Sequence, residues 1–311
     1  MMVVLLKSIA CLVNQLPLPL LQAAGRGLGR LAYRIDRRHR DIALANLTMA
    51  FGRERSRREL ASIAVRLFEN LGMNMMEFSR LPWLKRGNLK GYVRCEGLEH
   101  LEKALRRGKG VIFITGHLGN WELMAAWYGL KGYPVDVVVR DLDSPLVDDF
   151  VRWVRTRSGN RVVPKRRSMR ELLRTLRGGG IVGILLDQNV TWSEGVFVNF
   201  FGKLACTNKG AALLAVASGA PVVPTFIVRK GRGHRIIVGR EIEVVNSGDR
   251  RSDVIENTCR FTRAIEDMVR RYPDQWFWIH QRWKSRPEND PRRGTDLAAP
   301  VQTPVKVRKS R

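Results

Sequence analysis

Short apolar runs rich in β-branched residues recur along this chain and are separated by stretches with helical spacing. The strongest run, residues 111–115, reads VIFIT. Similar runs occupy residues 135–139, 181–186 and 222–228, with helical stretches at 121–130, 145–157, 168–176 and 209–217. A strand that is apolar on both sides must be covered on both faces. The alternation therefore predicts an α/β fold with a mixed, largely parallel sheet flanked by helices.

The residues before the strongest run add a short strand and further helices to this prediction. Residues 93–96 are typical of a strand, and residues 98–107 have helical spacing. Apolar side chains recur every three or four positions across residues 56–81, which predicts one or two amphipathic helices. These helices would pack their apolar sides on the domain.

The chain is strongly basic. Its 311 residues include 55 Lys or Arg and 29 Asp or Glu, for a net charge of +26 with His neutral. Such a surplus favours a polyanionic partner: nucleic acid, an anionic membrane, a phosphorylated substrate or an acidic carrier protein. Ten of the cations lie in residues 151–180, beside one Glu. That segment is either a solvated face or a docking surface for an acidic partner.

The N-terminal residues have the composition of a membrane-associating segment. Residues 8–25 contain no charged side chain, and Pro17 and Pro19 should interrupt any helix there. An arginine-rich stretch with interleaved apolar residues follows, which suits an anionic bilayer surface. We expect a membrane-associating segment over residues 1–30, either spanning or interfacial, a folded domain over 31–286, and a basic, disordered tail over 287–311.

The distribution of cysteines and histidines gives no support for a metal or disulfide framework. The four cysteines contain no CxxC pair, and the five histidines contain neither HxxxH nor HExxH. The sequence also lacks a Walker loop and a GxSxG elbow. We therefore expect no metal and no cofactor.

The stretch TGHLGNWEL places polar residues directly after the run 111–115, where ligands bind in open α/β sheets. His117 and Glu122 are five positions apart, so an unbroken helix would separate them by roughly 140°. A turn over residues 116–119, followed by a helix starting near Asn120, would let the carboxylate swing back. Glu122 could then accept a hydrogen bond from one ring nitrogen and leave the other as a general base. The pair could equally satisfy polar groups of a loop.

GHLGNWEL resembles the HxxxxE motif of the lipid A biosynthesis acyltransferases, the late lauroyl and myristoyl transferases of the lysophospholipid acyltransferase superfamily. The resemblance continues in the family's order over most of the chain. It includes RDIALANLTMAF (40–51), VVVR ending at Arg140, LLDQ ending at Gln188, FFGKLACTNKGAALLAVASGAPVVP, and YPDQWFWIHQRWKSRP (272–287). Glu122 stands where the glycerophosphate acyltransferase branch carries Asp.

The resemblance implies an O-acyltransferase that moves a fatty acyl chain from an acyl carrier protein thioester to a hydroxyl of a lipid A precursor of the Kdo2-lipid IVA type. It also implies the cytoplasmic face of a bacterial inner membrane. His117 would act as base and Glu122 would stabilise the imidazolium. The candidate substrate-binding residues are Asn120 for the oxyanion and Arg140 for the oxyanion or an acceptor phosphate. Asp187 and Gln188 should line the same crevice, where they either contact substrate or order the loop, and Thr207 and Lys209 lie in the next motif.

Two other functions remain open from the sequence. One is an acyltransferase of the same branch with a lysophospholipid, aminolipid or glycosylated phospholipid as acceptor. The other is a basic nucleic-acid-binding protein, whose binding would fall steeply with salt and would not depend on His117. No recognised nucleic-acid-binding motif is present, and the apolar N-terminus has no role in such a protein.

Overall fold

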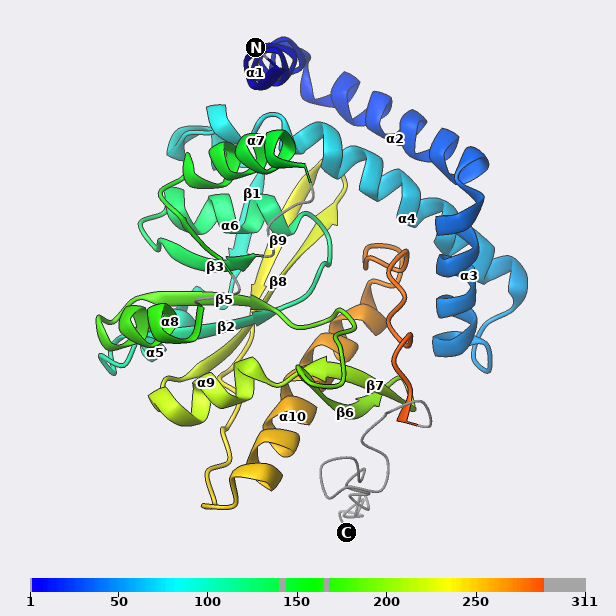
Figure 1. The fold of residues 1–311 in the computed structure, drawn as a ribbon. Helices are drawn as coiled ribbons and strands as arrows, with labels where there is room; N and C mark the ends of the chain where they lie inside the picture. The colour runs from blue at the N-terminus through cyan, green and yellow to red at the C-terminus, as the bar shows by residue number, and fades with distance from the viewer. Residues whose placement is uncertain (1, 140–143, 165–167, 288–311) are drawn as a thin grey trace.

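The computed structural model describes residues 2–139, 144–164 and 168–287, and its centre is a seven-stranded mixed sheet (Figure 1). The strand order is β1-β9-β8-β2-β5-β3-β4. Strands β8, β2, β5, β3 and β4 run parallel, whereas β9 is antiparallel to β8 and parallel to β1. The bounds are β1 Val93–Glu96, β2 Val111–Thr115, β3 Val135–Val139, β4 Arg161–Pro164, β5 Ile181–Leu185, β8 Val222–Lys230 and β9 Gly233–Val238. The predicted mixed, largely parallel sheet is confirmed.

Helices cover both faces of the sheet because its central strands are apolar on both sides. In β2, Val111 and Phe113 join a core with α5, α6 and α7, whereas Ile112 and Ile114 join a core with α8, α9 and α10. All five residues of β2 are buried. The helices span α5 Leu98–Leu105, α6 Trp121–Leu130, α7 Pro145–Thr156, α8 Ser168–Arg177, α9 Gly210–Ser218 and α10 Arg250–Arg271.

Most predicted elements match the structure within two residues, but several structural elements have no counterpart among the predictions. These include β4, β9 and α10, and the two strands of an antiparallel hairpin, β6 (Gly195–Phe200) and β7 (Lys203–Asn208). These elements interleave polar and apolar residues, as in KLACTN of β7, so no continuous apolar run identifies them. The hairpin packs on α10 and forms a small sheet of its own.

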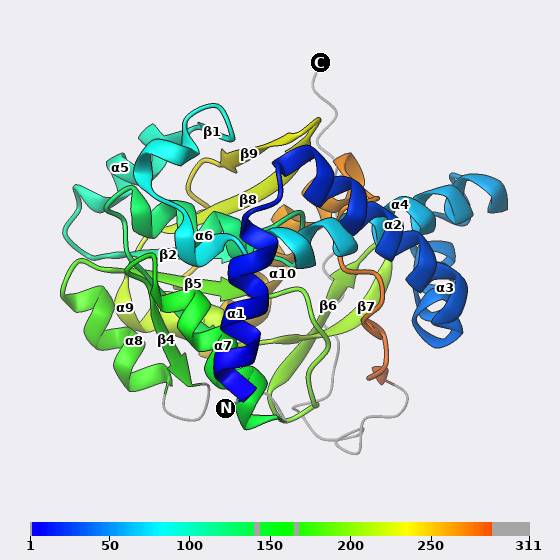
Figure 2. The same cartoon turned by 90° about the horizontal axis from the view of Figure 1, so that it is seen from above.

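Four α-helices precede the sheet: α1 Met2–Asn14, α2 Leu18–Ile35, α3 Arg37–Phe51 and α4 Arg57–Phe78. Two short 3₁₀ helices, Leu81–Trp83 and Arg86–Leu89, then lead to β1. The break between α1 and α2 contains Pro17, as predicted. Helix α1 lies across α7 (Figure 2), where the Lys7 ammonium is 4.8 Å from the centre of the Trp153 ring. Within residues 2–139, 144–164 and 168–287, no helix combines the length and the apolar character that a membrane crossing requires. The predicted tail lies, apart from Pro287, outside the described residues.

Helices α2 and α4 approach each other at backbone contact, through glycines. A Cβ atom on Gly29 would lie 2.1 Å from the carbonyl oxygen of Phe68, and one on Gly72 would lie 2.1 Å from the carbonyl oxygen of Gly25. Both distances are far below van der Waals contact, so the helices must separate to accept a side chain. This packing attaches α2 to the rest of the domain.

We predict that Gly29→Ala lowers the free energy of unfolding by about 1–3 kcal/mol, because overpacking forces the helices apart. Gly27→Ala is the matched control: it lies on the exposed side of the same helix, where an added Cβ atom would have no neighbour within 4 Å. It should raise the free energy of unfolding by about 0.5–1 kcal/mol through helix propensity. Urea unfolding of both variants measures the difference, and equal effects would contradict the close contact.

Candidate functional site

The turn between β2 and α6, residues 116–120 and here called the His117 turn, lies at the carboxyl end of the central strand. Gly119 adopts φ +58°, and a Cβ there would lie 2.1 Å from the carbonyl oxygen of Ile227. Asn120 caps α6, because its side-chain oxygen accepts a hydrogen bond from the N–H of Leu123 at 3.0 Å. The predicted turn and the helix start near Asn120 are confirmed.

Asp187 holds the His117 ring. Its Oδ1 lies 2.8 Å from His117 Nδ1, and its Oδ2 accepts the backbone N–H of His117 at 2.7 Å and the indole N–H of Trp276 at 2.7 Å. Asp187 comes directly after Leu186, whose N–H still pairs with Thr115 of β2. The neighbouring carboxyl ends of β5 and β2 thus bring the two side chains together.

Asp187 is ionised at neutral pH. Burial alone would raise the pKa of this carboxyl, but the charge and hydrogen bonds of His117 and the indole of Trp276 lower it to about 2. A carboxylate can only accept, so His117 Nδ1 carries the proton and Nε2 is the basic nitrogen. Among the described residues Nε2 has no hydrogen-bond partner, and His117 lines a cavity.

The predicted hydrogen bond between Glu122 and the His117 ring is wrong. Within the described part of the chain no hydrogen bond joins them; Glu122 instead forms a bidentate ion pair with Arg155 of α7, with one contact at 3.0 Å. The physical reason is that Asp187 already occupies Nδ1, while α7 presents a guanidinium to the first turn of α6. The sequence did not identify Arg155, because nothing distinguishes it from the other cations of the basic run 151–180.

Two other candidates do not face the site as predicted. Asn120 is 2% exposed, and its amide donates to Glu77 at 2.8 Å while its oxygen caps α6, so this side chain is not available to an oxyanion. The Lys209 ammonium donates a hydrogen bond to the backbone carbonyl of Ser193 at 2.9 Å.

The remaining candidates divide between the site and its surroundings. Thr207 is fully buried, where its hydroxyl accepts from Arg282. Neither Thr207 nor Lys209 is among the described residues that line the cavity, whereas Gln188 is. Arg140 lies outside the described residues.

The cavity has a volume of about 800 Å³ and a mostly apolar lining. Its polar lining includes His117, Glu122, Arg155, Gln188 and His280. Its apolar lining comes from β2, β3, β5, α6, α8 and α9, and includes Phe113, Val137, Met124, Leu172 and Leu214. The cavity can take a hydrocarbon chain while its polar groups act on a reacting head group.

The C-terminal segment, residues 272–287, holds the His117 turn through backbone hydrogen bonds. The Phe277 N–H donates to the carbonyl of His117 at 3.0 Å, and the Gly119 N–H donates to the carbonyl of Gln275 at 2.9 Å. His280 Nε2 accepts the Asn189 N–H at 2.9 Å, and burial lowers the pKa of His280 to about 4. His280 is therefore neutral and holds the loop after Asp187.

The tryptophans of this segment, Trp276, Trp278 and Trp283, are buried in the core. Outside residues 1, 140–143, 165–167 and 288–311, no three His, Cys, Asp or Glu side chains cluster as metal ligands would.

Comparison with known proteins identifies the family. The family model described as bacterial lipid A biosynthesis acyltransferase matches residues 2–285. The chain belongs to this family. It is 31% identical over 286 residues to the lipid A biosynthesis lauroyltransferase of Escherichia coli K12, with 91% of each chain covered. The protein is therefore an O-acyltransferase, and this replaces the nucleic-acid-binding alternative.

More distant relatives include two named for other acyl chains or acceptors. The palmitoleoyltransferase of E. coli K12 is 28% identical over 279 residues, covering 88% of each chain. The phosphatidylinositol mannoside acyltransferase of Mycobacterium tuberculosis is 28% identical over 226 residues, covering 69% of this chain and 68% of its own. The solved 1-acyl-sn-glycerophosphate (LPA) acyltransferase PlsC of Thermotoga maritima matches 82% of this chain and 99% of its own, at 15% identity and a TM-score of 0.39.

We predict that Asp187 makes stability depend on acidity. Its pKa of about 2 lies below the ordinary 3.8, so its stabilisation is fully present above pH 4 and is lost as the pH falls toward 2. The difference in free energy of unfolding between the wild type and Asp187→Asn should shrink over that range. Urea unfolding at several pH values measures it. The exposed Asp267 of α10 provides the control, Asp267→Asn, for the loss of one carboxylate from the surface.

Proposed function

We propose that this acyltransferase moves a fatty acyl chain from an acyl carrier protein thioester to a hydroxyl of a lipid A precursor. The observation that carries the proposal is the His117–Asp187 pair at a large, mostly apolar cavity. Membership of the lipid A biosynthesis family and similarity to the lauroyltransferase support the acceptor and a saturated medium-length chain.

In the proposed mechanism His117 Nε2 removes the proton from the acceptor hydroxyl as the oxygen attacks the thioester carbonyl. The ionised Asp187 fixes the tautomer and stabilises the imidazolium that forms. The tetrahedral intermediate then collapses, its carbon–sulfur bond breaks, and the imidazolium returns its proton to the leaving thiolate. The products are an ester and the free carrier thiol, and no cofactor is consumed.

Glu122 and Arg155 act as a unit in this proposal. Both line the cavity, and the bidentate pair holds the partly exposed guanidinium of Arg155 in place beside it. Arg155 keeps N–H donors that can face the developing oxyanion or a phosphate of the acceptor. Glu122 therefore serves the reaction through Arg155, rather than through the imidazole as the sequence suggested.

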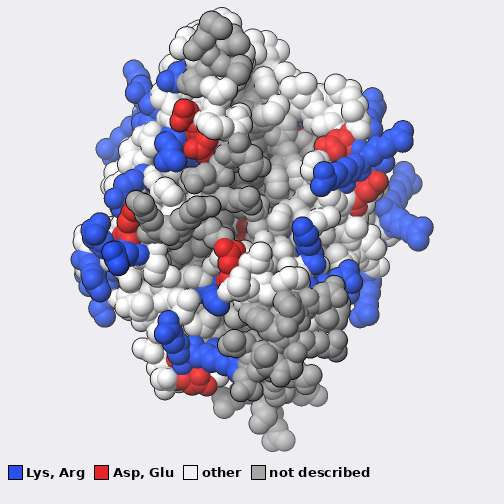
Figure 3. Space-filling model, viewed as in Figure 1, with Lys and Arg blue, Asp and Glu red and all other residues white. Residues whose placement is uncertain are grey.

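The carrier protein is proposed to dock on a basic stripe of α8. Arg170, Arg174 and Arg177 are exposed on this helix at positions i, i+4 and i+7, which place them on one side. By contrast, Arg155 and Arg161 of the same basic run are paired with Glu122 and Asp136. Figure 3 shows Lys and Arg gathered along both margins of one face, with Asp and Glu side chains interspersed among them. An acidic carrier would be steered to such a surface.

Membrane contact is proposed through the N-terminal helices, at the cytoplasmic face of the inner membrane. Large apolar side chains are exposed along α1 and α2: Leu12, Leu20, Leu28, Leu31 and Ile35. In α2, arginines accompany them, as expected for a helix lying at the level of lipid headgroups. A surface-lying helix pair needs no spanning segment.

A second acceptor class has one observation in its favour. The relative named phosphatidylinositol mannoside acyltransferase suggests a glycosylated phospholipid as the alternative acceptor. The His117 chemistry would be the same for either hydroxyl. A panel of both acceptors in one assay separates the two candidates.

We predict that His117→Ala lowers acyl transfer by about 10³-fold or more, as does loss of the base in other base-dependent acyl transfers. The assay is mass spectrometry of lipid products after incubation with acyl carrier thioesters and an underacylated lipid A precursor. His39→Ala, on the partly exposed α3, is the matched control and should keep wild-type turnover. Turnover by His117→Ala close to that of the wild type would exclude His117 as the base.

We predict that the triple substitution Leu20→Gln, Leu28→Gln and Leu31→Gln weakens binding to phosphatidylglycerol vesicles at least about tenfold. These leucines are 44–59% exposed on one side of α2, so removing their apolar surface should reduce partition more than it affects folding. Vesicle sedimentation measures the partition. Val147→Gln and Leu204→Gln, exposed elsewhere, are the controls. Unchanged partition of the triple variant would exclude this surface as the membrane contact.

A further inference from the structure

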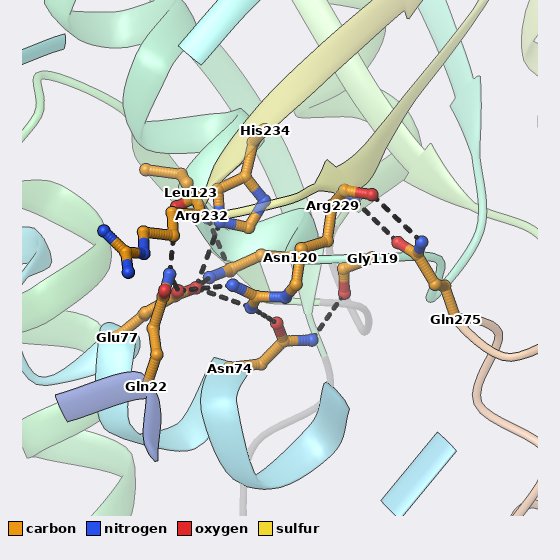
Figure 4. Close-up of polar contacts among 10 residues, drawn as sticks. All are labelled: Gln22, Asn74, Glu77, Gly119, Asn120, Leu123, Arg229, Arg232, His234 and Gln275. Carbon is orange, nitrogen blue, oxygen red and sulfur yellow. Dashed lines mark hydrogen bonds and ion pairs between the residues drawn. The ribbon is translucent and has the colours of Figure 1, made fainter. Parts of the chain in front are cut away.

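The His117 turn is held from one side by helix α4 (Figure 4). Asn74 donates its amide to the carbonyl of Gly119 at 2.7 Å, and Glu77 accepts the amide of Asn120 at 2.8 Å. Asn74 and Glu77 are three positions apart, so they lie on the same side of α4. They bind the last two residues of the turn, immediately after His117 and Leu118.

Glu77 is the centre of a buried polar cluster that joins five elements. Glu77 is 2% exposed. Its two oxygens accept hydrogen bonds from Gln22 of α2, Asn120 of the turn and Arg229 of β8 at 2.6–2.8 Å. His234 Nε2 of β9 lies 3.2 Å from one of these oxygens. Burial opposes its ionisation, but the hydrogen bonds of His234 and Arg229 keep the pKa of Glu77 well below its usual range. Glu77 is an ionised carboxylate whose two oxygens accept hydrogen bonds from three side chains.

The same cluster closes a ring of contacts around the turn. The Arg229 guanidinium also donates to Asn74 at 2.8 Å. The backbone N–H of Arg229 donates to the side-chain oxygen of Gln275 at 2.7 Å. The backbone carbonyl of Gln275 in turn accepts the Gly119 N–H at 2.9 Å. The turn is therefore fixed from α4, β8 and the C-terminal segment at once (Figure 4).

We propose that Glu77, acting through Asn120, is a positioning residue for His117. Glu77 is not among the described residues that line the cavity, so it acts through the turn and not on substrate. Its contacts set where α6 begins and where the turn lies relative to Asp187. A displacement of about 1 Å at a reacting group costs about 100-fold in rate, so losing the Glu77–Asn120 contact should lower turnover. This inference rests on the proposed function of His117.

The alternative role for Glu77 is purely structural, as an anchor of α2 and α4 on the sheet. A structural anchor would change stability without a selective change in turnover. The two roles are separated by exchanging the carboxylate and the amide between positions 77 and 120. In the wild type the cluster holds one anion, Glu77, and one cation, Arg229.

Asn120→Asp places a second carboxylate against Glu77 but keeps a good helix cap. In the exchange variant, Glu77→Gln with Asn120→Asp, the amide at position 77 can donate to the carboxylate at position 120. This pair again has one donor, one acceptor and a single negative charge. We expect Asn120→Asp to lower kcat about 10–100-fold with KM within about threefold, and the exchange to return kcat to within about fivefold of wild type. Asn120→Ser is a milder variant that keeps the cap and removes the donor to Glu77, and it should also lower kcat selectively.

Asn257→Asp is the matched control. Asn257 is as buried as Asn120, and among the described residues its side chain hydrogen-bonds the backbone of Val245, away from the turn. It should lower the melting temperature and leave kcat unchanged. A structural role for Glu77 predicts that Asn120→Asp behaves in the same way.

A readout independent of activity is the proton resonance of His117 Nδ1–H, which is hydrogen-bonded to Asp187. It should shift or broaden in Asn120→Asp and return in the exchange variant, in the full-length protein in detergent. The proposal is overturned if that resonance and kcat are unaffected in Asn120→Asp and Asn120→Ser, or if the exchange restores the melting temperature but neither kcat nor the resonance. If the wild type transfers no acyl chain, the proposed function fails, and the resonance alone decides whether Glu77 positions His117.

Discussion

The site depends on one buried anion, Asp187. A carboxylate removed from water is tolerated only where donors surround it, and Asp187 obtains them from the His117 ring, the His117 backbone and the indole of Trp276. These donors come from the turn after β2 and from the C-terminal segment, while Asp187 itself follows β5. Satisfying this one charge therefore brings three distant parts of the chain together. It also decides which nitrogen of His117 is basic.

Two buried carboxylates on either side of the turn have complementary roles. Asp187 binds the ring of His117, and Glu77 binds the residue that starts α6, so the imidazole and its backbone are held separately. Glu122, the third carboxylate, is committed to Arg155. Each anion thus has its own cationic or N–H partners, which prevents the like charges from competing for the imidazole. A rigid turn with one free basic nitrogen facing an apolar cavity is what an acyl transfer to a hydroxyl requires.

Much of the sheet and the outline of the site could be predicted from the sequence, but the pairing of its side chains could not. The run VIFIT predicted β2, and the glycines and Asn120 after it predicted the turn and the start of α6. Proximity in the sequence predicts a hydrogen bond between Glu122 and the His117 ring. Asp187, seventy residues away, takes that position because β5 is the neighbour of β2 in the sheet, and strand order is not encoded in local spacing.

The sequence by itself determined the alternation of helices and strands, the break before α2, the location of His117 at a strand end and the acyltransferase family. These depend on local properties: apolar periodicity, the fixed φ of proline, the freedom of glycine and a motif of adjacent residues. Tertiary structure alone decided that Asp187 orients His117, that Arg155 pairs with Glu122, and that Glu77 holds the turn. Each of these contacts joins a carboxylate to a donor far away in the sequence, and each forms because a carboxylate removed from water needs donors, which the folded backbone brings within reach.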